Sequence, residues 1–317
     1  MASEAGFGQS MSAFGVAKTA PTQAERVAAI AAHPQMPEAM RLLASGLIDF
    51  FQGSRLLNLI ASDRGRMVMA WMALYLDAGH DPRDPLSGLT VNRYKALCAS
   101  TGVCSPGRGA AMLGIMRFAG YLEPAGRAHR GLPLRLIPTE KLRAQQRERW
   151  RRVFPALARV RPEGEIGLAL IDEPAFHKAF IRASVNTYLS GRPPIDFGPA
   201  LMPFADQKAG FMVLMSLMLS TPPEDRMPPS GPMSVPVARL ARRFAVSRAQ
   251  VKHTLRSAVA AGLLTPTGPD QAAYLITPVL RESLFGFVAA LLLLLADGIT
   301  GAQAELNAGA APVEDVA

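Results

Sequence analysis

An internal duplication is the feature that most constrains the fold of this 317-residue chain. The segment RFAGYLEP, residues 117–124, is followed about 142 residues later by AAGLLTP, residues 260–266. Further similar pairs occur in the same order, and their offset drifts only from about 139 to 147: 48–50 with 195–197, 63–74 with 206–217, 87–88 with 230–231, 89–91 with 233–235, 94–97 with 237–240, 103–105 with 245–247 and 136–139 with 275–278. This shared order predicts two copies of one folding unit.

Both copies have the same predicted order of elements. An apolar helix (about 63–77, then 206–219) is followed by a Pro-rich loop, a short helix (about 91–100, then 236–244) and another helix (about 106–119, then 248–261). Ser105 and Ser247 precede these last helices, where a hydroxyl caps free backbone N–H groups. Gly120 and Gly262 supply the left-handed residue that ends them. A strand, a loop, a strand and a final helix complete each copy.

This order resembles that of winged helix-turn-helix transcription factors, and the arrangement is most similar to the MarR type. The phrase LRLIPTEK, residues 134–141, resembles the return strand of a wing that runs into the last helix. The resemblance covers about 60–150 and 205–297. It implies a mainly α fold with small β wings, in which two tandem winged-helix units form a pseudo-dimer. MarR-type proteins pair two separate chains, whereas this chain carries both units.

The expected boundaries follow from composition and from the duplication. We expect a flexible N-terminal arm over 1–39, a first copy over 40–160, a second copy over 165–298 and a disordered tail over 299–317. The arm has no apolar segment behind a basic start, so it predicts no secretory signal, and a bacterial cytoplasmic location is expected.

One apolar run, residues 284–296, needs a membrane test. It is shorter than the roughly 17–25 residues of a membrane span and predicts a buried helix. Together with Trp71 and Trp150, this helix is expected to supply much of the core or of the contact between the copies.

The charge distribution points to a polyanionic partner. Lys and Arg number 34 against 25 Asp and Glu, which gives a net charge of +9 and an isoelectric point near 10.1. Residues 40–160 hold 19 basic and 8 acidic residues, whereas residues 165–298 hold 12 and 10. The predicted first wing carries Arg127 and Arg130, and the second wing has no cation. We therefore expect DNA affinity to depend mainly on the first copy.

The helix caps, the free helix faces and the first wing give the candidate DNA-binding residues. Ser105 and Ser247 are expected to hold phosphates at helix N-termini. Base edges would be contacted by Arg108, Arg248 and Gln250. Arg127 and Arg130 would enter an adjacent minor groove. The complete set is Ser105, Gly107, Arg108, Arg117, Arg127, Arg130, Ser247, Arg248, Gln250, Lys252, His253 and Arg256.

Other chemistry finds little support in the sequence. There is no Gly-rich phosphate loop or dinucleotide fingerprint, and the five histidines and two cysteines lack metal-ligand spacing. The sequence thus predicts no enzyme, no cofactor and no metal. It predicts a sequence-specific double-stranded DNA-binding transcriptional regulator, as a monomeric pseudo-dimer or a homodimer.

Two alternatives stay open. A plasmid- or phage-type replication initiator also resembles tandem winged helices. A protein-interaction module, whose second copy has lost DNA binding, would fit the acidic-leaning second wing.

Overall fold

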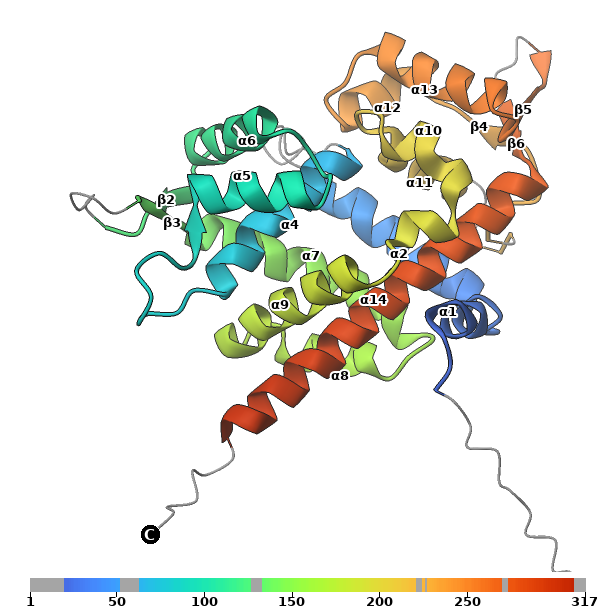
Figure 1. Ribbon diagram of the computed structural model, residues 1–317. Helices are drawn as coiled ribbons and strands as arrows, with labels where there is room; N and C mark the ends of the chain where they lie inside the picture. Colours follow the sequence, from blue (N-terminus) through green and yellow to red (C-terminus); the bar gives the residue numbers. More distant parts are fainter. Residues whose placement is uncertain are drawn as a thin grey trace, which may run out of the picture.

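The computed structural model describes residues 20–51, 63–126, 133–220, 224–225, 227–269 and 273–310. These residues are mainly helical, with two small antiparallel sheets that lie at opposite ends of the molecule (Figure 1). The predicted class, mainly α with small β elements, is confirmed.

The first copy builds a three-stranded sheet from distant segments. Its elements are α4 (Arg64–Ala78), β1 (Leu89–Thr90), α5 (Val91–Ser100), α6 (Pro106–Phe118), β2 (Leu122–Pro124), β3 (Arg135–Pro138) and α7 (Glu140–Ala158). Strand β3 lies between β1 and β2 and is antiparallel to both. Leu89 is paired with Leu136 across this sheet, and both are buried. The sheet therefore closes one side of the α4–α5–α6 core.

The second copy repeats this order. Its elements are α11 (Gly210–Met218), β4 (Met233–Ser234), α12 (Val237–Arg243), α13 (Arg248–Ala260), β5 (Leu264–Thr267), β6 (Ala273–Ile276) and α14 (Pro278–Ala310). Strand β6 lies between β4 and β5, again antiparallel to both. The two copies thus share element order and sheet topology. The three helices predicted with bounds in each copy lie within about four residues of their expected ends, whereas the helix predicted over 284–296 extends over Pro278–Ala310 as α14.

Further helices join and cover the two copies. They are α1 (Gln23–Ala31), α2 (Met36–Phe51), α8 (Glu163–Leu170), α9 (Pro174–Ser190), η1 (Pro194–Phe197), η2 (Pro199–Leu201) and α10 (Met202–Ala205). Helix α2 packs along α7 and also against α11, so it bridges the copies. Helix α14 crosses the molecule and packs along α9, α1 and η1 (Figure 1).

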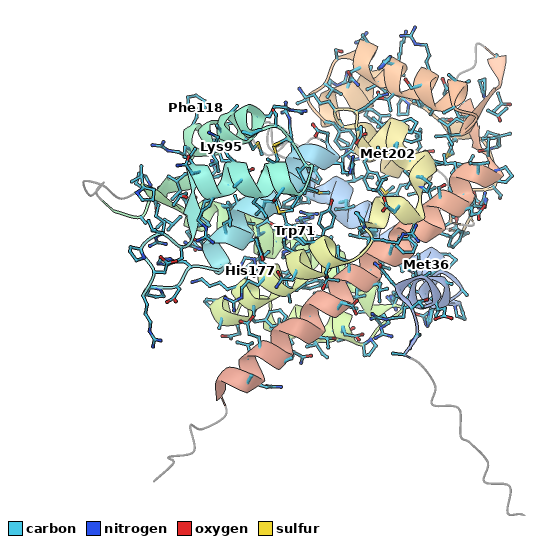
Figure 2. The ribbon with its side chains drawn as sticks, viewed as in Figure 1. Met36, Trp71, Lys95, Phe118, His177 and Met202 are labelled. Atoms are coloured by element: carbon cyan, nitrogen blue, oxygen red, sulfur yellow. The ribbon has the colours of Figure 1, made fainter. Side chains whose placement is uncertain are left out.

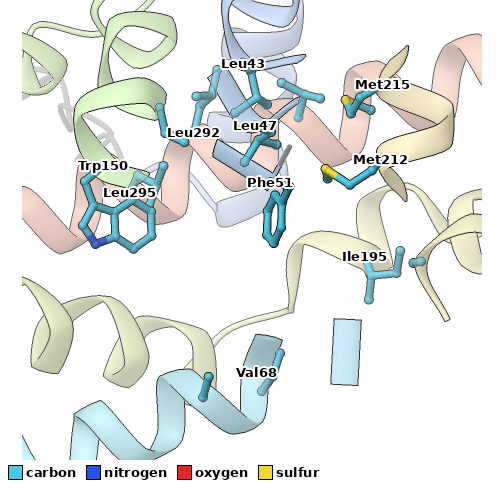
Figure 3. Packing of buried hydrophobic residues seen from close by; sticks show 14 of the residues in the cluster. Leu43, Leu47, Phe51, Val68, Trp150, Ile195, Met212, Met215, Leu292 and Leu295 are labelled. Carbon is cyan, nitrogen blue, oxygen red and sulfur yellow. The ribbon is translucent and has the colours of Figure 1, made fainter. Parts of the chain in front are cut away.

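Aromatic and leucine side chains form the core where the copies meet. Trp150 is 2% exposed, and its ring centroid lies 5.9 Å from that of Phe154 and 6.2 Å from that of Trp71. In Figure 3, Leu292 and Leu295 of α14 lie beside Trp150. The expected core role of the two tryptophans and of the 284–296 run is confirmed.

Helix α14 is the one helix within the described ranges that is long and apolar enough to cross a membrane. Most of its apolar window is buried inside the protein, as in a core helix. Glycines allow this close packing: a Cβ on Gly286 would lie 2.0 Å from the Phe197 carbonyl oxygen, and one on Gly298 would lie 2.0 Å from the Ser184 hydroxyl.

Parts of both segments that were expected to be flexible are helical. Residues 23–31 and 36–39, placed in the N-terminal arm, belong to α1 and α2, because Thr22 and Glu25 form a capping box and Val27 and Ile30 are buried. Residues 299–310, placed in the tail, continue α14, because Ile299 and Ala302 still pack into the core.

One of the sequence matches is not a structural equivalence. Residues 48–50 lie within α2, whereas residues 195–197 lie in the 3-10 helix η1. The same three letters therefore occupy different local structures, and this pair gives no support to the duplication.

Candidate nucleic-acid interface

Helix α13 of the second copy is fixed by the local signals seen in its sequence. Ser247 accepts the N–H of Gln250 at 3.0 Å and caps the helix. Gly262, with φ +69°, ends it and turns the chain into β5. The inward face holds Val251, Leu255 and Ala258 against the core. The opposite face is left to solvent.

This outward face of α13 is a row of cations. Arg248, Lys252 and Arg256 are spaced four residues apart, so they follow one line of about 12 Å along the helix surface. All three are exposed, and none has an ion-pair partner in the part of the chain that the structure describes. His253 is exposed beside them. Because these cations are unpaired, they remain available to anionic groups of a partner.

Helix α12, which packs against α13, carries two further exposed cations that the sequence analysis missed. Arg239 and Arg242 are exposed and also have no ion-pair partner within the described ranges. Arg243 differs, because it faces Asp49 of α2 at 3.8 Å. The available signal was the motif VARLARR, which places several arginines on a short helix immediately before the turn. We call Arg239, Arg242, Arg248, Lys252 and Arg256 the α12–α13 basic face.

Unlike the neighbouring cations, Gln250 has a side chain that is hydrogen-bonded within the protein. Its side-chain amide donates to Gln207 Oε1 at 3.3 Å, and the Thr254 hydroxyl donates to the same oxygen at 2.7 Å. Gln250 is consequently half-buried. The expected base-contacting role would require this hydrogen bond to break.

Helix α6 of the first copy has the same construction but a different outward face. Ser105 accepts the N–H of Arg108 at 3.5 Å, Pro106 opens the helix and Gly120, with φ +71°, follows its end. Arg108 and Arg117 are exposed, together with residues that carry little or no side chain: Gly107, Ala111 and Gly114. Phe118, at the end of α6, is 90% exposed (Figure 2). Arg127 and Arg130 of the predicted wing lie outside the described residues.

Several cations of the first copy are engaged by groups of the protein itself. Arg147 pairs with Glu140, Arg152 with Glu148, and Arg151 with Asp172 of the α8–α9 connection. Lys141 donates to the Ala119 carbonyl at 2.7 Å, at the end of α6, and lies 4.6 Å above the Tyr121 ring centroid. Glu140 and Glu148 are already subtracted in the charge excess counted over residues 40–160, so these two pairs do not reduce it, and the expected dominance of the first copy in DNA binding stays a prediction.

The two capped helices lie on the same side of the molecule. In Figure 1, α6 lies at the upper left of the view and α13 at the upper right, and α14 runs diagonally below them. Among the described residues there is no cluster of three metal-ligating side chains.

Comparison with protein-family models, with curated proteins and with solved structures gives no match. The function of this surface is therefore inferred from its own geometry and charge.

Proposed function

We propose that the chain is a sequence-specific double-stranded DNA-binding protein built from two tandem winged helix-turn-helix units, and that it acts as a bacterial transcriptional regulator. The main supporting observation is the α12–α13 basic face, which lies on the second and third helices of a helix–strand–helix–helix–hairpin unit, with Arg248, Lys252 and Arg256 on the third. In a helix-turn-helix protein this third helix enters the major groove. The capped N-terminus of α13 would hold a phosphate.

The positions of the cationic side chains suggest which of them would contact bases and which would contact phosphates. Arg248 lies in the first turn of α13, the part of a recognition helix that approaches base edges. Lys252 and Arg256 lie further along and, with Arg239 and Arg242 on α12, would neutralise phosphates of the backbone. Helix α6, with Arg108 and Arg117, would occupy a second half-site that need not repeat the first.

The decisive experiment measures DNA binding as a function of salt. A duplex selected from a random library by the wild-type protein is titrated by fluorescence anisotropy at several salt concentrations. The variant R248Q/K252Q/R256Q should bind more weakly, and the slope of log K against log salt should become shallower by about 0.9 for each phosphate that the variant no longer neutralises. The control variant R83Q/R159Q/K178Q removes the same charge from exposed residues on other elements and should keep the wild-type slope. Equal reductions in affinity in both variants would contradict an α13 interface.

The genomic positions of the selected sequences also distinguish a transcriptional regulator from the alternative functions. Discrete genomic sites upstream of genes fit a regulator, whereas clusters of direct repeats would indicate a replication initiator. Recovery of no sequence preference at any salt would contradict specific DNA binding.

A second function is favoured for the first copy by the exposed Phe118. An almost fully exposed aromatic ring beside the smooth surface of Gly107, Ala111 and Gly114 is typical of a protein-contact surface. In this alternative α6 docks a protein and only α13 contacts DNA. The variant F118S would then leave DNA affinity unchanged, whereas R108Q would weaken binding if α6 lies on DNA.

A further inference from the structure

A largely apolar cavity of about 120 Å³ lies where the two copies meet. Its walls come from α2, α4, α7, α9, α11 and α14, and Figure 3 looks into this region. The lining includes Leu47, Phe51, Val68, Met212 and Leu295. An apolar cavity of similar size, about 150 Å³, accommodates a single benzene ring in another protein. The space therefore suits one ring or a short aliphatic chain.

One wall of the cavity carries a cation without a counter-ion. Arg149 of α7 donates from Nη2 to the Met67 sulfur at 3.1 Å, and its guanidinium lies 4.7 Å above the Trp150 ring centroid. No carboxylate within the described ranges forms an ion pair with it. Burial lowers the pKa of Arg149 to about 10, which leaves the side chain charged at neutral pH. Arg149 as a whole is half-buried, but its Nε is enclosed, and a charge that is partly removed from water normally has a partner because desolvation is costly.

The other charged residues of the lining are already engaged. Arg64 pairs with Asp206 at 3.0 Å. Asp63 caps α4 through the N–H of Arg66 and pairs with the Arg66 guanidinium at 3.3 Å. Arg149 is thus the lining cation whose charge is left uncompensated in the described part of the chain.

The buried polar atoms of the described lining that have no hydrogen-bond partner are all donors that lack an acceptor. Arg149 Nε, Trp71 Nε1 and Trp150 Nε1 are buried donors with no acceptor among the described residues. All three residues line the cavity. The site therefore provides an apolar space together with donors and a positive charge, and it lacks an anionic acceptor.

We propose that this cavity binds a small organic monocarboxylate with an apolar body, its carboxylate held by Arg149 and its ring or chain lying among the leucine and aromatic side chains. The charge-assisted hydrogen bonds would offset the desolvation of Arg149. This inference is independent of DNA binding, and its test contains no DNA.

The two tryptophans allow a direct test, because the chain has only two and both line the cavity. Benzoate and hexanoate are titrated into the protein while tryptophan fluorescence is recorded, with benzamide and hexanamide as uncharged analogues of the same shape. We expect at least one carboxylate to change the fluorescence saturably, and its amide to bind at least tenfold more weakly. Equal binding of acid and amide, or no saturable change with either acid, would overturn the proposal.

Substitution of Arg149 gives a second, separate readout. In R149M the affinity for the carboxylate should fall at least tenfold while amide binding stays unchanged. The control R151M, on the exposed side of the same helix, should retain wild-type affinity. Unchanged carboxylate affinity in a folded R149M protein would contradict the role of the guanidinium. If R149M does not fold, V68F tests the same site by filling the cavity, and binding that persists in it would overturn the location.

Discussion

The hydroxyl of Thr139 donates to the carbonyl oxygen of Gly120 at 2.8 Å and ties the end of α6 to the start of α7. Thr277 makes the equivalent bond to Gly262 at 2.9 Å in the second copy. The backbone N–H groups agree, because Thr139 donates to the Tyr121 carbonyl and Thr277 to that of Leu263. The two threonines are therefore equivalent.

This equivalence shifts one sequence match by a residue. The match of 136–139 with 275–278 placed Thr139 opposite Pro278. Strand register instead sets Pro138 opposite Leu122 and Ile276 opposite Leu264, so that Pro138 corresponds to Ile276. Similar letters in a different order, LIPT and LITP, concealed the correct register.

The threonine bonds should contribute measurably to stability. T139V keeps the shape of the side chain but removes the donor to Gly120, and we expect the free energy of unfolding to fall by about 1 kcal/mol. T277V should cost more, because the Thr277 hydroxyl also accepts the N–H of Leu280, while its one proton is shared between the Gly262 and Leu263 carbonyls. Urea unfolding followed by circular dichroism measures both. If both variants had wild-type stability, these hydrogen bonds would make no net contribution to the free energy of unfolding.

The turns that precede α6 and α13 differ in length and in the residue that takes the left-handed conformation. In the first copy Gly102 takes the left-handed conformation, with φ +67°, and Val103 and Cys104 lead to the cap Ser105. In the second copy Ala245 takes this conformation, with φ 52°, and Val246 alone precedes the cap Ser247. The first turn is thus one residue longer, and the second places a Cβ where glycine is favoured.

Replacing Ala245 by glycine and Gly102 by alanine should change the stability of the protein in opposite directions. A left-handed conformation costs a non-glycine residue about 1–2 kcal/mol, more than the entropy that glycine adds to the unfolded chain. Ala245 is exposed, so A245G loses little packing and should stabilise the protein by about 0.5–1 kcal/mol. G102A should destabilise it by about 1 kcal/mol through the backbone alone, because a Cβ there would meet nothing within 4 Å. Thermal unfolding of both variants checks the signs, and a destabilised A245G would refute the strain at this turn.

Local signals explain why much of the fold was predictable. Ser105, Ser247, Gly120 and Gly262 act within their own helix ends, so their positions in the sequence sufficed to place α6 and α13. The capping box of Thr22 and Glu25 is an equally local signal for α1 that the sequence analysis overlooked.

The candidate site was harder to predict because it depends on which charges find partners. Arg151 is neutralised by Asp172, and Gln250 is held by Gln207. These partners come from other helices or loops, so neither a helical wheel nor a charge count reveals them. A pair within one helix, such as Glu148 and Arg152 of α7, can be predicted from the spacing of four residues, but partners from other elements are found only in the folded chain.

His177 should make the stability of the protein depend on pH. Its side chain is 6% exposed on α9, where burial, and then the charges of Arg147 and Arg143, lower its pKa from 6.5 to about 4, with Glu140 opposing them. Between these values the unfolded chain binds a proton at this histidine and the folded protein does not. The free energy of unfolding should therefore fall as the pH is lowered from about 6.5 to 4, by up to about 3 kcal/mol from this residue.

The variant H177L separates this contribution from that of the carboxyl groups. Leucine fills a similar apolar space and cannot titrate, so the free energy of unfolding of H177L should decline less between pH 7 and pH 4.5 than that of the wild-type protein. H253Q removes an exposed histidine and should keep the wild-type pH dependence. Urea unfolding at four pH values across this range gives the comparison. Parallel profiles for H177L and the wild-type protein would mean that His177 is protonated at the same pH in the folded and unfolded chains, and hence that its burial does not suppress its charge.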